Sequence, residues 1–537
     1  MSTPKEIEIK LELSPAILPR LKKIPLLQAR KGGAVRRSAE VSVYFDTGKH
    51  KLRKSGLMLR VRRIGKRYIQ TIKATGKSGL FERDEWESGI ASAQPDLDLA
   101  RGTALEALAG RKLRRRLKPM FETRVARTVY PLSSSKGEIE FTVDRGTIAA
   151  GDRSAPLCEI ELELKRGSQS ELFNVARELM QAVPARLEFR SKSQRGYDLL
   201  DDKGVAPVTA ERVELVAGIS TRDGFKTIGR ACLRQIVGNG PALLKGDPEG
   251  VHQMRVGLRR LRAALSLFAD MLTDPQTAAI KTGLQWLQGE LGPAREFEVL
   301  MKRVVAPVKK RRARWDGVPS LSHELAEKRE AALSRAQDAV KSTRFHALTL
   351  DIAAWLETGD WSRPRDDRIR DLGQVPIEVS AARQLNRRWK KIRRKGKAVA
   401  RLDAKRRHKL RIQTKKVRYA AEFFGSLFPG KRASKRRKRF GPALEALQDA
   451  LGDLNDIAVH EELIGATGMR RRRVSRKRAF ATGVLMGHED ARLDAAFAAA
   501  IDAYAVGQGQ AVLGVIRRRP HHRPPRYSST QAGDALA

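Results

Sequence analysis

Residues 6–13 have the sequence EIEIKLEL. In an extended strand, successive side chains point to opposite faces, so this stretch places its charged side chains on one face and its aliphatic ones on the other. The same alternation recurs at residues 57–63, 68–73, 138–144 and 159–165, with glycine-containing turns between segments and one helical stretch at 169–183. Residues 1–200 are therefore predicted to form a β domain.

From about residue 222 onward the apolar residues recur with the 3.6-residue period of a helix, and Ala, Leu, Arg, Lys and Glu dominate. The sequence therefore predicts an α+β protein of two domains. We expect the β domain at 1–200, a linker at 201–221 and an all-helical domain at 222–505. The basic tail at 506–537 is predicted to be disordered, because it is polar and rich in proline and arginine.

The helical half contains an internal repeat. VHQMRVGLRRLRAALSLF, from residue 251, aligns with RHKLRIQTKKVRYAAEFF, from residue 407, and the segments that begin at residues 284 and 444 align in the same way. Two related halves are predicted, at about 222–345 and 375–505. Each copy has a histidine and three cations at spacings i, i+3, i+7 and i+10, which lie along one stripe of a helix. These stripes are His252, Arg255, Arg259 and Arg262, and His408, Arg411, Lys415 and Arg418.

The charge balance indicates a polyanionic partner. The chain has 107 Lys and Arg against 61 Asp and Glu, a formal net charge of +46. Nucleic acid, anionic membrane and polyphosphate are the candidates. Only 5% of the residues are aromatic, and we find neither a base-stacking platform nor a nucleic-acid recognition motif, so nucleic acid is expected to bind only through non-specific charge.

Neither export nor membrane insertion is indicated. The charged start MSTPKEIEIK does not resemble a signal peptide, and no stretch is apolar enough to span a bilayer. Cys158 and Cys232 are too few for a disulfide framework. We therefore expect a soluble protein of the cytoplasm, and the oligomeric state stays open.

The charged faces of the β segments indicate a phosphate site. Glu138, Glu140 and Asp144 share one strand face, a second strand carries three carboxylates at 159, 161 and 163, and Arg60 and Arg62 form a basic pair on a third. A solvated sheet face would give the same alternation on any one strand. If the faces converge inside a barrel, the carboxylates could hold divalent cations and the basic side chains could hold phosphate oxygens.

The N-terminal half resembles the CYTH family, the triphosphate tunnel enzymes. The resemblance covers roughly residues 1–200 and rests on an ordered set of motifs. They are Glu6-x-Glu8-x-Lys10, YFDT from residue 44, LRVR from 59, TIK from 71, FERDEWE from 81, Arg124, Asp144, EIELELK from 159 and Lys192 to Arg195.

This resemblance implies an eight-stranded antiparallel barrel that forms a tunnel and holds Mg²⁺ or Mn²⁺. The implied metal ligands are Glu6, Glu8, Asp144 and Glu161 with Glu159 or Glu163, between which we do not choose. The implied triphosphate-binding residues are Lys10, Arg60, Arg62, Lys73, Arg124, Lys192 and Arg195. Glu6, Glu8 and Lys10 are the implied catalytic residues. A general base is not identified, although Lys10 would suit that role if neighbouring cations lowered its pKa.

The helical half resembles the CHAD domain over about residues 222–505, on the basis of His252-x-x-Arg255, His408-x-x-Arg411 and the paired segments that end in LG at 291 and LGDLND at 451. This resemblance implies two four-helix bundles whose basic stripes face a shared groove for inorganic polyphosphate. The alternatives are a solvated basic face and a metal site at the histidines. The second is disfavoured because arginine, rather than carboxylate, accompanies each histidine.

Together the two resemblances predict a phosphohydrolase that cleaves inorganic triphosphate to diphosphate and phosphate and binds polyphosphate. One alternative is a thiamine or nucleoside triphosphatase, or a class IV-type adenylyl cyclase. Another, of a different class, is a non-catalytic polyphosphate-binding or targeting protein. Whether the helical half feeds or regulates the barrel stays open.

Overall fold

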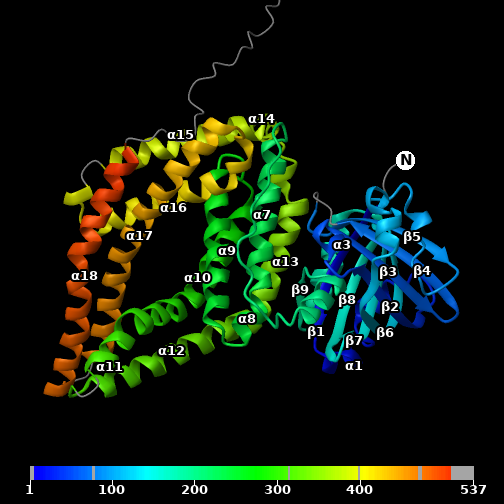
Figure 1. The fold of residues 1–537 in the computed structure, drawn as a ribbon, viewed down its shortest axis with the longest axis horizontal. Coiled ribbons are helices and arrows are strands. Elements are labelled where there is room, and N and C mark those ends of the chain that lie inside the picture. Colours follow the sequence, from blue (N-terminus) through cyan, green and yellow to red (C-terminus); the bar gives the residue numbers. More distant parts are fainter. Residues whose placement is uncertain (1–4, 75–78, 313–314, 397–398, 470–473, 509–537) are drawn as a thin grey trace, which may run out of the picture.

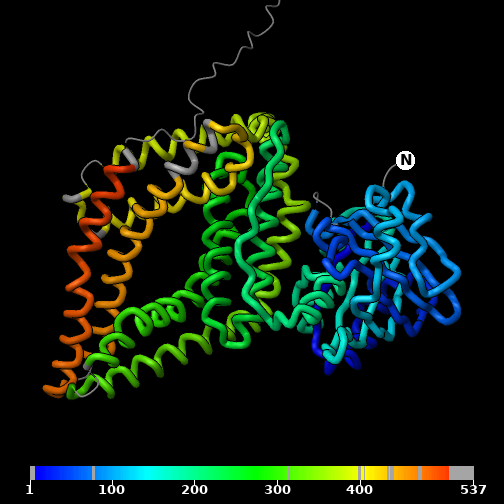
Figure 2. Tube along the Cα trace, viewed as in Figure 1, coloured from blue at the N-terminus to red at the C-terminus, as the bar shows by residue number. Residues whose placement is uncertain are grey.

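The computed structural model describes residues 5–74, 79–312, 315–396, 399–469 and 474–508. Its N-terminal part is a closed barrel, and its C-terminal part is helical (Figure 1). Figure 2 shows that the chain, coloured from blue to red, completes the barrel before it enters the helices. Most of the predicted tail, from residue 509, lies outside the described residues.

The barrel is an antiparallel sheet in the order β5-β4-β3-β2-β6-β7-β8-β1-β9, closed by pairing of β1 with β5. Eight strands form the barrel, and β9 adds to β1 outside the closed ring. The strands are β1 Lys5–Leu13, β2 Arg36–Thr47, β3 Leu57–Ile64, β4 Arg67–Ala74, β5 Glu82–Ile90, β6 Leu117–Ser134, β7 Gly137–Ala150, β8 Arg153–Gly167 and β9 Ala185–Glu188. The prediction of an eight-stranded antiparallel barrel is confirmed.

The alternation in residues 6–13 determines how β1 is placed. Ile9 and Leu11 are fully buried in the apolar core outside the tunnel, where Leu172 and Phe173 of helix α5 (Gln169–Ala182) belong to the same core. Glu8 and Lys10 therefore point to the opposite face, into the barrel. The register sets Glu8 opposite Glu163 and Lys10 opposite Glu161.

The remaining elements are helical. Short helices lie around the barrel at α1 Leu18–Leu21, α2 Pro25–Ala29, α3 Lys51–Lys54 and α4 Arg111–Arg114, and α6 spans Lys192–Leu200. The C-terminal helices are α7 Thr221–Gly238, α8 Gly240–Leu244, α9 Pro248–Leu267, α10 Pro275–Leu300, α11 Ala306–Arg312, α12 Val318–Lys341, α13 Thr343–Thr358, α14 Asp367–Gln374, α15 Ile377–Gly396, α16 Ala404–Phe423, α17 Lys431–Gly468 and α18 Arg476–Gln508. Among the described residues, none of these helices is both long and apolar enough to cross a membrane.

The repeat is visible in how the helices begin and pack. Asp247 caps α9 by accepting from the Glu249 backbone N–H at 2.8 Å, and Asp403 caps α16 by accepting from the Arg406 N–H at 2.7 Å. In the first half α9 packs on α7 and α10, and α10 on α12; in the second, α16 packs on α15 and α17, and α17 on α18. The stripe-bearing helices α9 and α16 contact each other, which joins the two halves.

The barrel and the helices share a packed interface. Helix α13 packs against α5 and β9, and α7 also contacts β9 (Figure 1). Leu187 of β9, Val213 and Leu215 of the connecting segment, and Phe225 of α7 belong to one continuous buried apolar cluster. The connecting segment is therefore packed against the rest of the protein and is not a flexible linker between the barrel and the helices.

Candidate functional site

The barrel encloses a cavity of about 700 Å³, which we call the tunnel. Side chains from the inner faces of β1, β3, β4, β5, β6, β7 and β8 line it, and the start of α6 borders it. The predicted residues that line the tunnel are Glu6, Glu8, Lys10, Arg60, Arg62, Lys73, Glu161, Glu163 and Lys192. The tunnel therefore brings together carboxylates and cations from the predicted set, while Arg124, Asp144, Glu159 and Arg195 are not among its lining residues.

Lys10 lies between two carboxylates. Its ammonium group contacts both Glu8 and Glu161, and its side chain is 9% exposed. Burial, followed by the nearby Glu161, raises the pKa of Glu8 to about 7. Burial opposes the charged form of Lys10, yet Glu161 and Glu8 outweigh it and raise the pKa of that ammonium. In this arrangement the two carboxylates favour the charged form of Lys10, and its role as a base stays a prediction.

A second group of carboxylates surrounds Lys192, which enters from the first turn of α6. Its Nζ lies 2.7 Å from Asp144, 2.6 Å from Glu159 and 2.7 Å from Glu161. These three carboxylates offer ligand oxygens that all lie within 4.8 Å of one another. Hard divalent cations prefer such oxygen sets, so the donor chemistry of this acidic cluster fits a divalent cation.

The cationic wall of the tunnel comes from β3 and β4. Arg60 donates to Thr71 at 3.0 Å, and Lys73 lies 2.5 Å from Glu6 and 3.0 Å from Glu85. Burial and the adjacent Arg60 lower the pKa of Arg62. The buried Nε atoms of Arg60 and Arg62 have no hydrogen-bond partner. An unsatisfied buried donor destabilises the folded protein, so these N–H groups favour the binding of an anionic ligand.

The two basic stripes form a second charged site. Arg259 of α9 reaches α16, where its Nε donates to the Tyr419 hydroxyl at 3.4 Å. Burial lowers the pKa of Lys415 to about 7, with Arg411, Arg259 and Arg255 as further causes. Burial and Arg259 lower the pKa of Arg255 to about 10. We call Arg255, Arg259, Arg411 and Lys415 the cationic cluster, because these side chains from both stripes act on one another as like charges.

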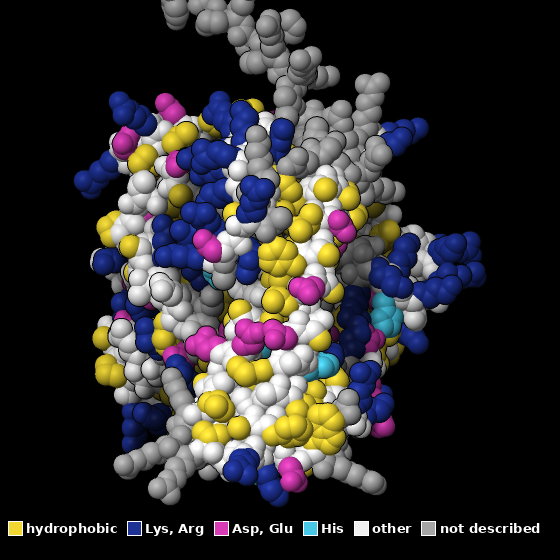
Figure 3. Space-filling view, turned by 90° about the vertical axis from the view of Figure 1, so that its left-hand side faces the viewer, with side chains coloured by type: hydrophobic (Ala, Val, Ile, Leu, Met, Phe, Trp, Pro, Cys, Tyr) yellow, Lys and Arg dark blue, Asp and Glu magenta, His cyan; other side chains and the backbone are white. Residues whose placement is uncertain are grey.

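The ends of the two stripes are built alike. Arg262 donates to Gln288 of α10, and its counterpart Arg418 donates to Gln448 of α17 at 2.6 Å. Within the cluster, Nε and Nη1 of Arg255 and Nε of Arg411 are buried without a hydrogen-bond partner. Figure 3, which views the molecule from the side of α17 and α18, shows Lys and Arg gathered in the upper part of that face.

Comparison with known proteins assigns both halves. Residues 4–197 match the model of the CYTH domain, and residues 227–465 match that of the CHAD domain. The chain consists of a CYTH domain followed by a CHAD domain. The recognition of both domains from sequence is thereby confirmed.

Individual relatives cover parts of the chain. The inorganic triphosphatase of Haemophilus influenzae is 32% identical over 200 residues, which are 36% of this chain and 54% of that protein, so the chain spans about half the length of this curated relative. The CHAD domain structure from the plant Ricinus communis is 30% identical and covers 55% of this chain and 97% of its own, with a TM-score of 0.47. A Hippeastrum protein described as an adenylyl cyclase with a dominant triphosphatase activity is 16% identical, covers 38% and 97%, and has a TM-score of 0.29.

Arg124, a predicted substrate residue of the CYTH domain, lies outside the tunnel. The Arg124 side chain is 68% exposed and pairs with Glu122 at 2.6 Å on the outer surface. Arg127, three residues later on β6, points inward and bonds to Asp144 at 2.6 Å and Glu161 at 2.8 Å. Residues three apart on a strand lie on opposite faces. The alternation of FETRVAR, with Phe121, Val125 and Arg127 on one face, was the signal that could have identified Arg127.

The structure also separates the carboxylates between which the sequence left a choice. Glu159 is fully buried within the acidic cluster, where Arg195 also reaches it at 3.3 Å. The Glu163 side chain is 27% exposed and pairs with Lys165 at 2.6 Å. The geometry therefore groups Glu159, rather than Glu163, with Glu161. Arg195, predicted to bind triphosphate, is held by Glu159 and by the Pro156 carbonyl at 3.0 Å and does not line the tunnel.

The CHAD stripes differ at their histidines. His408 bonds to Asn455 through Nδ1 at 2.9 Å, and Arg411 donates to the same Asn455 oxygen at 3.4 Å. The aligned residue in the first half is Arg295 rather than an amide. Burial, followed by Arg295, lowers the pKa of His252 to about 4. His252 is therefore neutral near pH 7, and Arg295 supplies the positive charge at that end of the first stripe.

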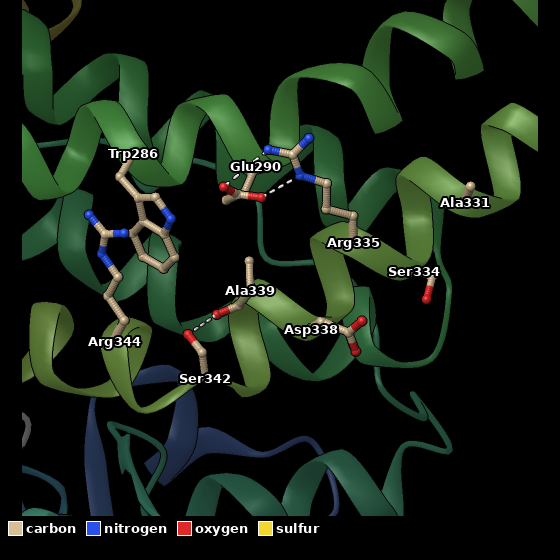
Figure 4. A pocket seen from close by; sticks show the side chains of 9 residues that line it. All are labelled: Trp286, Glu290, Ala331, Ser334, Arg335, Asp338, Ala339, Ser342 and Arg344. Carbon is tan, nitrogen blue, oxygen red and sulfur yellow. Dashed lines mark hydrogen bonds and ion pairs between the residues drawn. The ribbon is translucent and has the colours of Figure 1, made fainter.

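A separate hollow between α10, α12 and α13 contains cations that are already paired (Figure 4). Arg344 lies over the Trp286 ring with its guanidinium carbon 4.2 Å from the centroid. Arg335 forms two hydrogen bonds to Glu290, at 2.6 and 3.2 Å. These guanidinium groups are bound locally, unlike the buried Nε atoms of Arg255 and Arg411 in the cationic cluster.

Proposed function

We propose that the CYTH domain hydrolyses inorganic triphosphate to diphosphate and phosphate with Mg²⁺ or Mn²⁺. The single observation that supports this most is the juxtaposition of a buried acidic cluster, which reaches the tunnel through Glu161, with a wall of buried cations in that tunnel. A cation site alone would need only the carboxylates, and a simple phosphate site would exclude them by repulsion. Both together suit a phosphate chain that binds with a divalent cation between it and the carboxylates.

In this mechanism, the side chains Arg60, Arg62, Lys73 and Arg127 hold the phosphate oxygens and keep the chain aligned along the tunnel. Asp144, Glu159 and Glu161 would hold the divalent cation, together with Glu6 and Glu8 nearby. When bound, that cation would neutralise phosphate charge and polarise the scissile phosphoanhydride bond. Lys10 and Lys192 remain protonated and stabilise the negative charge that develops on the departing phosphate.

We further propose that the CHAD domain binds inorganic polyphosphate at the cationic cluster. The cluster gathers buried like charges whose free N–H donors match phosphate oxygens along a chain. Both cysteines are free and buried, which is compatible with the cytoplasmic location that we propose.

The test is phosphate release from inorganic triphosphate, ATP and thiamine triphosphate, each with Mg²⁺ or Mn²⁺ or with chelator. The variant is Glu6→Ala with Glu8→Ala, and the matched control is Glu122→Ala with Glu138→Ala, which removes two carboxylates of the same barrel that do not line the tunnel. We expect metal-dependent release from inorganic triphosphate that the tunnel variant loses and the control keeps. Preference for ATP or thiamine triphosphate would assign the substrate differently, and no release from any substrate would contradict hydrolysis.

A further inference from the structure

The CHAD domain takes part in lining the tunnel. Arg234 of α7 and Glu211 of the connecting segment line the same cavity as Glu8, Lys10 and Glu161. They lie there with Arg83 and Arg190 of the CYTH domain, which line the cavity as well. The tunnel entrance on this side is therefore a composite of both domains.

The arginines of this entrance are not equally available. Arg190 is held at 2.7 Å by Glu188, whose side chain is 7% exposed. Arg234 has a much looser partner: its Nε lies 3.4 Å from Glu211, and the two side chains are 37% and 55% exposed. Exposed, long ion pairs contribute little to stability, so Arg234 can exchange Glu211 for another anion at small cost.

The position of this pair is nevertheless fixed. Arg260 of α9 is fully buried and donates to the Glu211 carbonyl at 3.0 Å, to Gln235 at 2.9 Å and to Glu422 at 2.9 Å. Gln235 is the neighbour of Arg234 on α7. One buried guanidinium thus ties the backbone at Glu211 to α7, α9 and α16, and it holds the loose pair at the entrance.

We propose that Arg234 is a specificity-determining residue, which binds the outer phosphate of linear phosphate chains longer than triphosphate while the inner phosphates occupy the tunnel. This inference rests on the proposed function. A guanidinium offers paired donors to phosphate oxygens. The carboxylate of Glu211 repels the incoming anion until the Arg234 side chain leaves Glu211 and binds that anion. Triphosphate, which fits within the tunnel, does not need this contact.

The test measures kcat and KM for tripolyphosphate, tetrapolyphosphate and ATP with the full-length protein. Arg234→Gln is expected to raise KM for tetrapolyphosphate about fivefold, with KM for tripolyphosphate unchanged within about twofold and kcat unaffected. Glu211→Gln is expected to act in the opposite direction, lowering KM for tetrapolyphosphate about twofold, because it removes the competing carboxylate. The matched control is Arg212→Gln, which removes the same charge from an exposed neighbour that does not line the tunnel.

Equal changes for tripolyphosphate and tetrapolyphosphate, or effects no larger than those of the control, would overturn the inference and leave the proposed function intact. A raised KM for ATP alone would also overturn it, because the entrance would then recognise a nucleoside. A wild-type protein that hydrolyses none of these substrates would overturn the proposed function and this inference together.

Discussion

The tunnel and the cationic cluster both contain a buried lysine, but the two lysines have opposite surroundings. Lys192 has three carboxylates within 2.7 Å. Burial is the largest cause of the lowered pKa of Lys415, followed by Arg411 and Arg259, while Asp456 acts in the opposite direction. In the tunnel the lysine is therefore surrounded by opposite charge, whereas in the cluster the cations outnumber Glu296 and Asp456, the carboxylates that act on them. We propose that a phosphate chain enters the tunnel together with a divalent cation, whereas it binds the cationic cluster directly.

The largest expected effect follows from removing a carboxylate of the tunnel. Glu161 contacts Lys10, lies 2.7 Å from Lys192 and belongs to the acidic cluster. Glu161→Gln keeps the shape but removes the charge, so we expect triphosphate hydrolysis to fall about 1000-fold, while polyphosphate binding stays unchanged. Steady-state phosphate release and polyphosphate titration of the same sample check this. Hydrolysis at the wild-type rate would contradict the claim that the tunnel carboxylates are needed for the reaction.

The comparison also predicts stability changes of opposite sign. Lys192→Met removes the ammonium group that three buried carboxylates share and leaves them with Arg127, Lys10 and Arg195, which should destabilise the CYTH domain by about 3 kcal/mol. Lys415→Met relieves like-charge repulsion and should stabilise the CHAD domain by about 1 kcal/mol in the absence of polyanion. Calorimetric unfolding of each variant measures both changes. Destabilisation of similar size in both would mean that the cluster has an internal counter-charge.

The affinity of the CHAD domain should depend on one arginine from each stripe. Arg255→Gln with Arg411→Gln removes charged donors whose Nε atoms lack partners in the protein. We expect polyphosphate affinity to fall about 30-fold and triphosphate hydrolysis to stay within about twofold of wild type. Arg335→Gln with Arg344→Gln, in the paired hollow of Figure 4, is the control. Equal losses in both variants would indicate binding by overall charge alone.

A smaller effect is expected from pH. Because the pKa of Lys415 is lowered to about 7, its ammonium loses charge as the pH rises from 6 to 8. Polyphosphate binding should weaken up to about tenfold over this range, with proton uptake on binding above pH 7. Deprotonation of the phosphate chain itself would act in the opposite direction. Lys415→Arg should remove most of the pH dependence, and a wild-type affinity that does not change with pH would contradict this account.

The sequence predicted most of the fold because its apolar residues recur clearly, every second residue in the strands and about every 3.6 residues in the helices. The alternation in residues 6–13 placed Glu8 and Lys10 on one face and Ile9 on the other, and the aligned stripes located α9 and α16. The side chains inside the tunnel were harder to predict. The family motif indicated Arg124, although the alternation of side chains along β6 places that residue on the outer face. Lys10 was expected among cations. Its contact with Glu161 depends on the register between β1 and a strand about 150 residues away in the sequence. Arg234 gave no local signal, since its position at the tunnel depends on how the two domains pack.

The most direct test of the central claim compares the two sites before and after removal of divalent cations from one preparation of the wild-type protein. Triphosphate hydrolysis and polyphosphate affinity are measured with Mg²⁺, with Mn²⁺ and with excess chelator. The account predicts that chelation abolishes hydrolysis and leaves polyphosphate affinity within about twofold of its starting value. Hydrolysis that persists in chelator, or polyphosphate binding that is lost with it, would contradict the division between a cation-dependent tunnel and a cation-independent cluster.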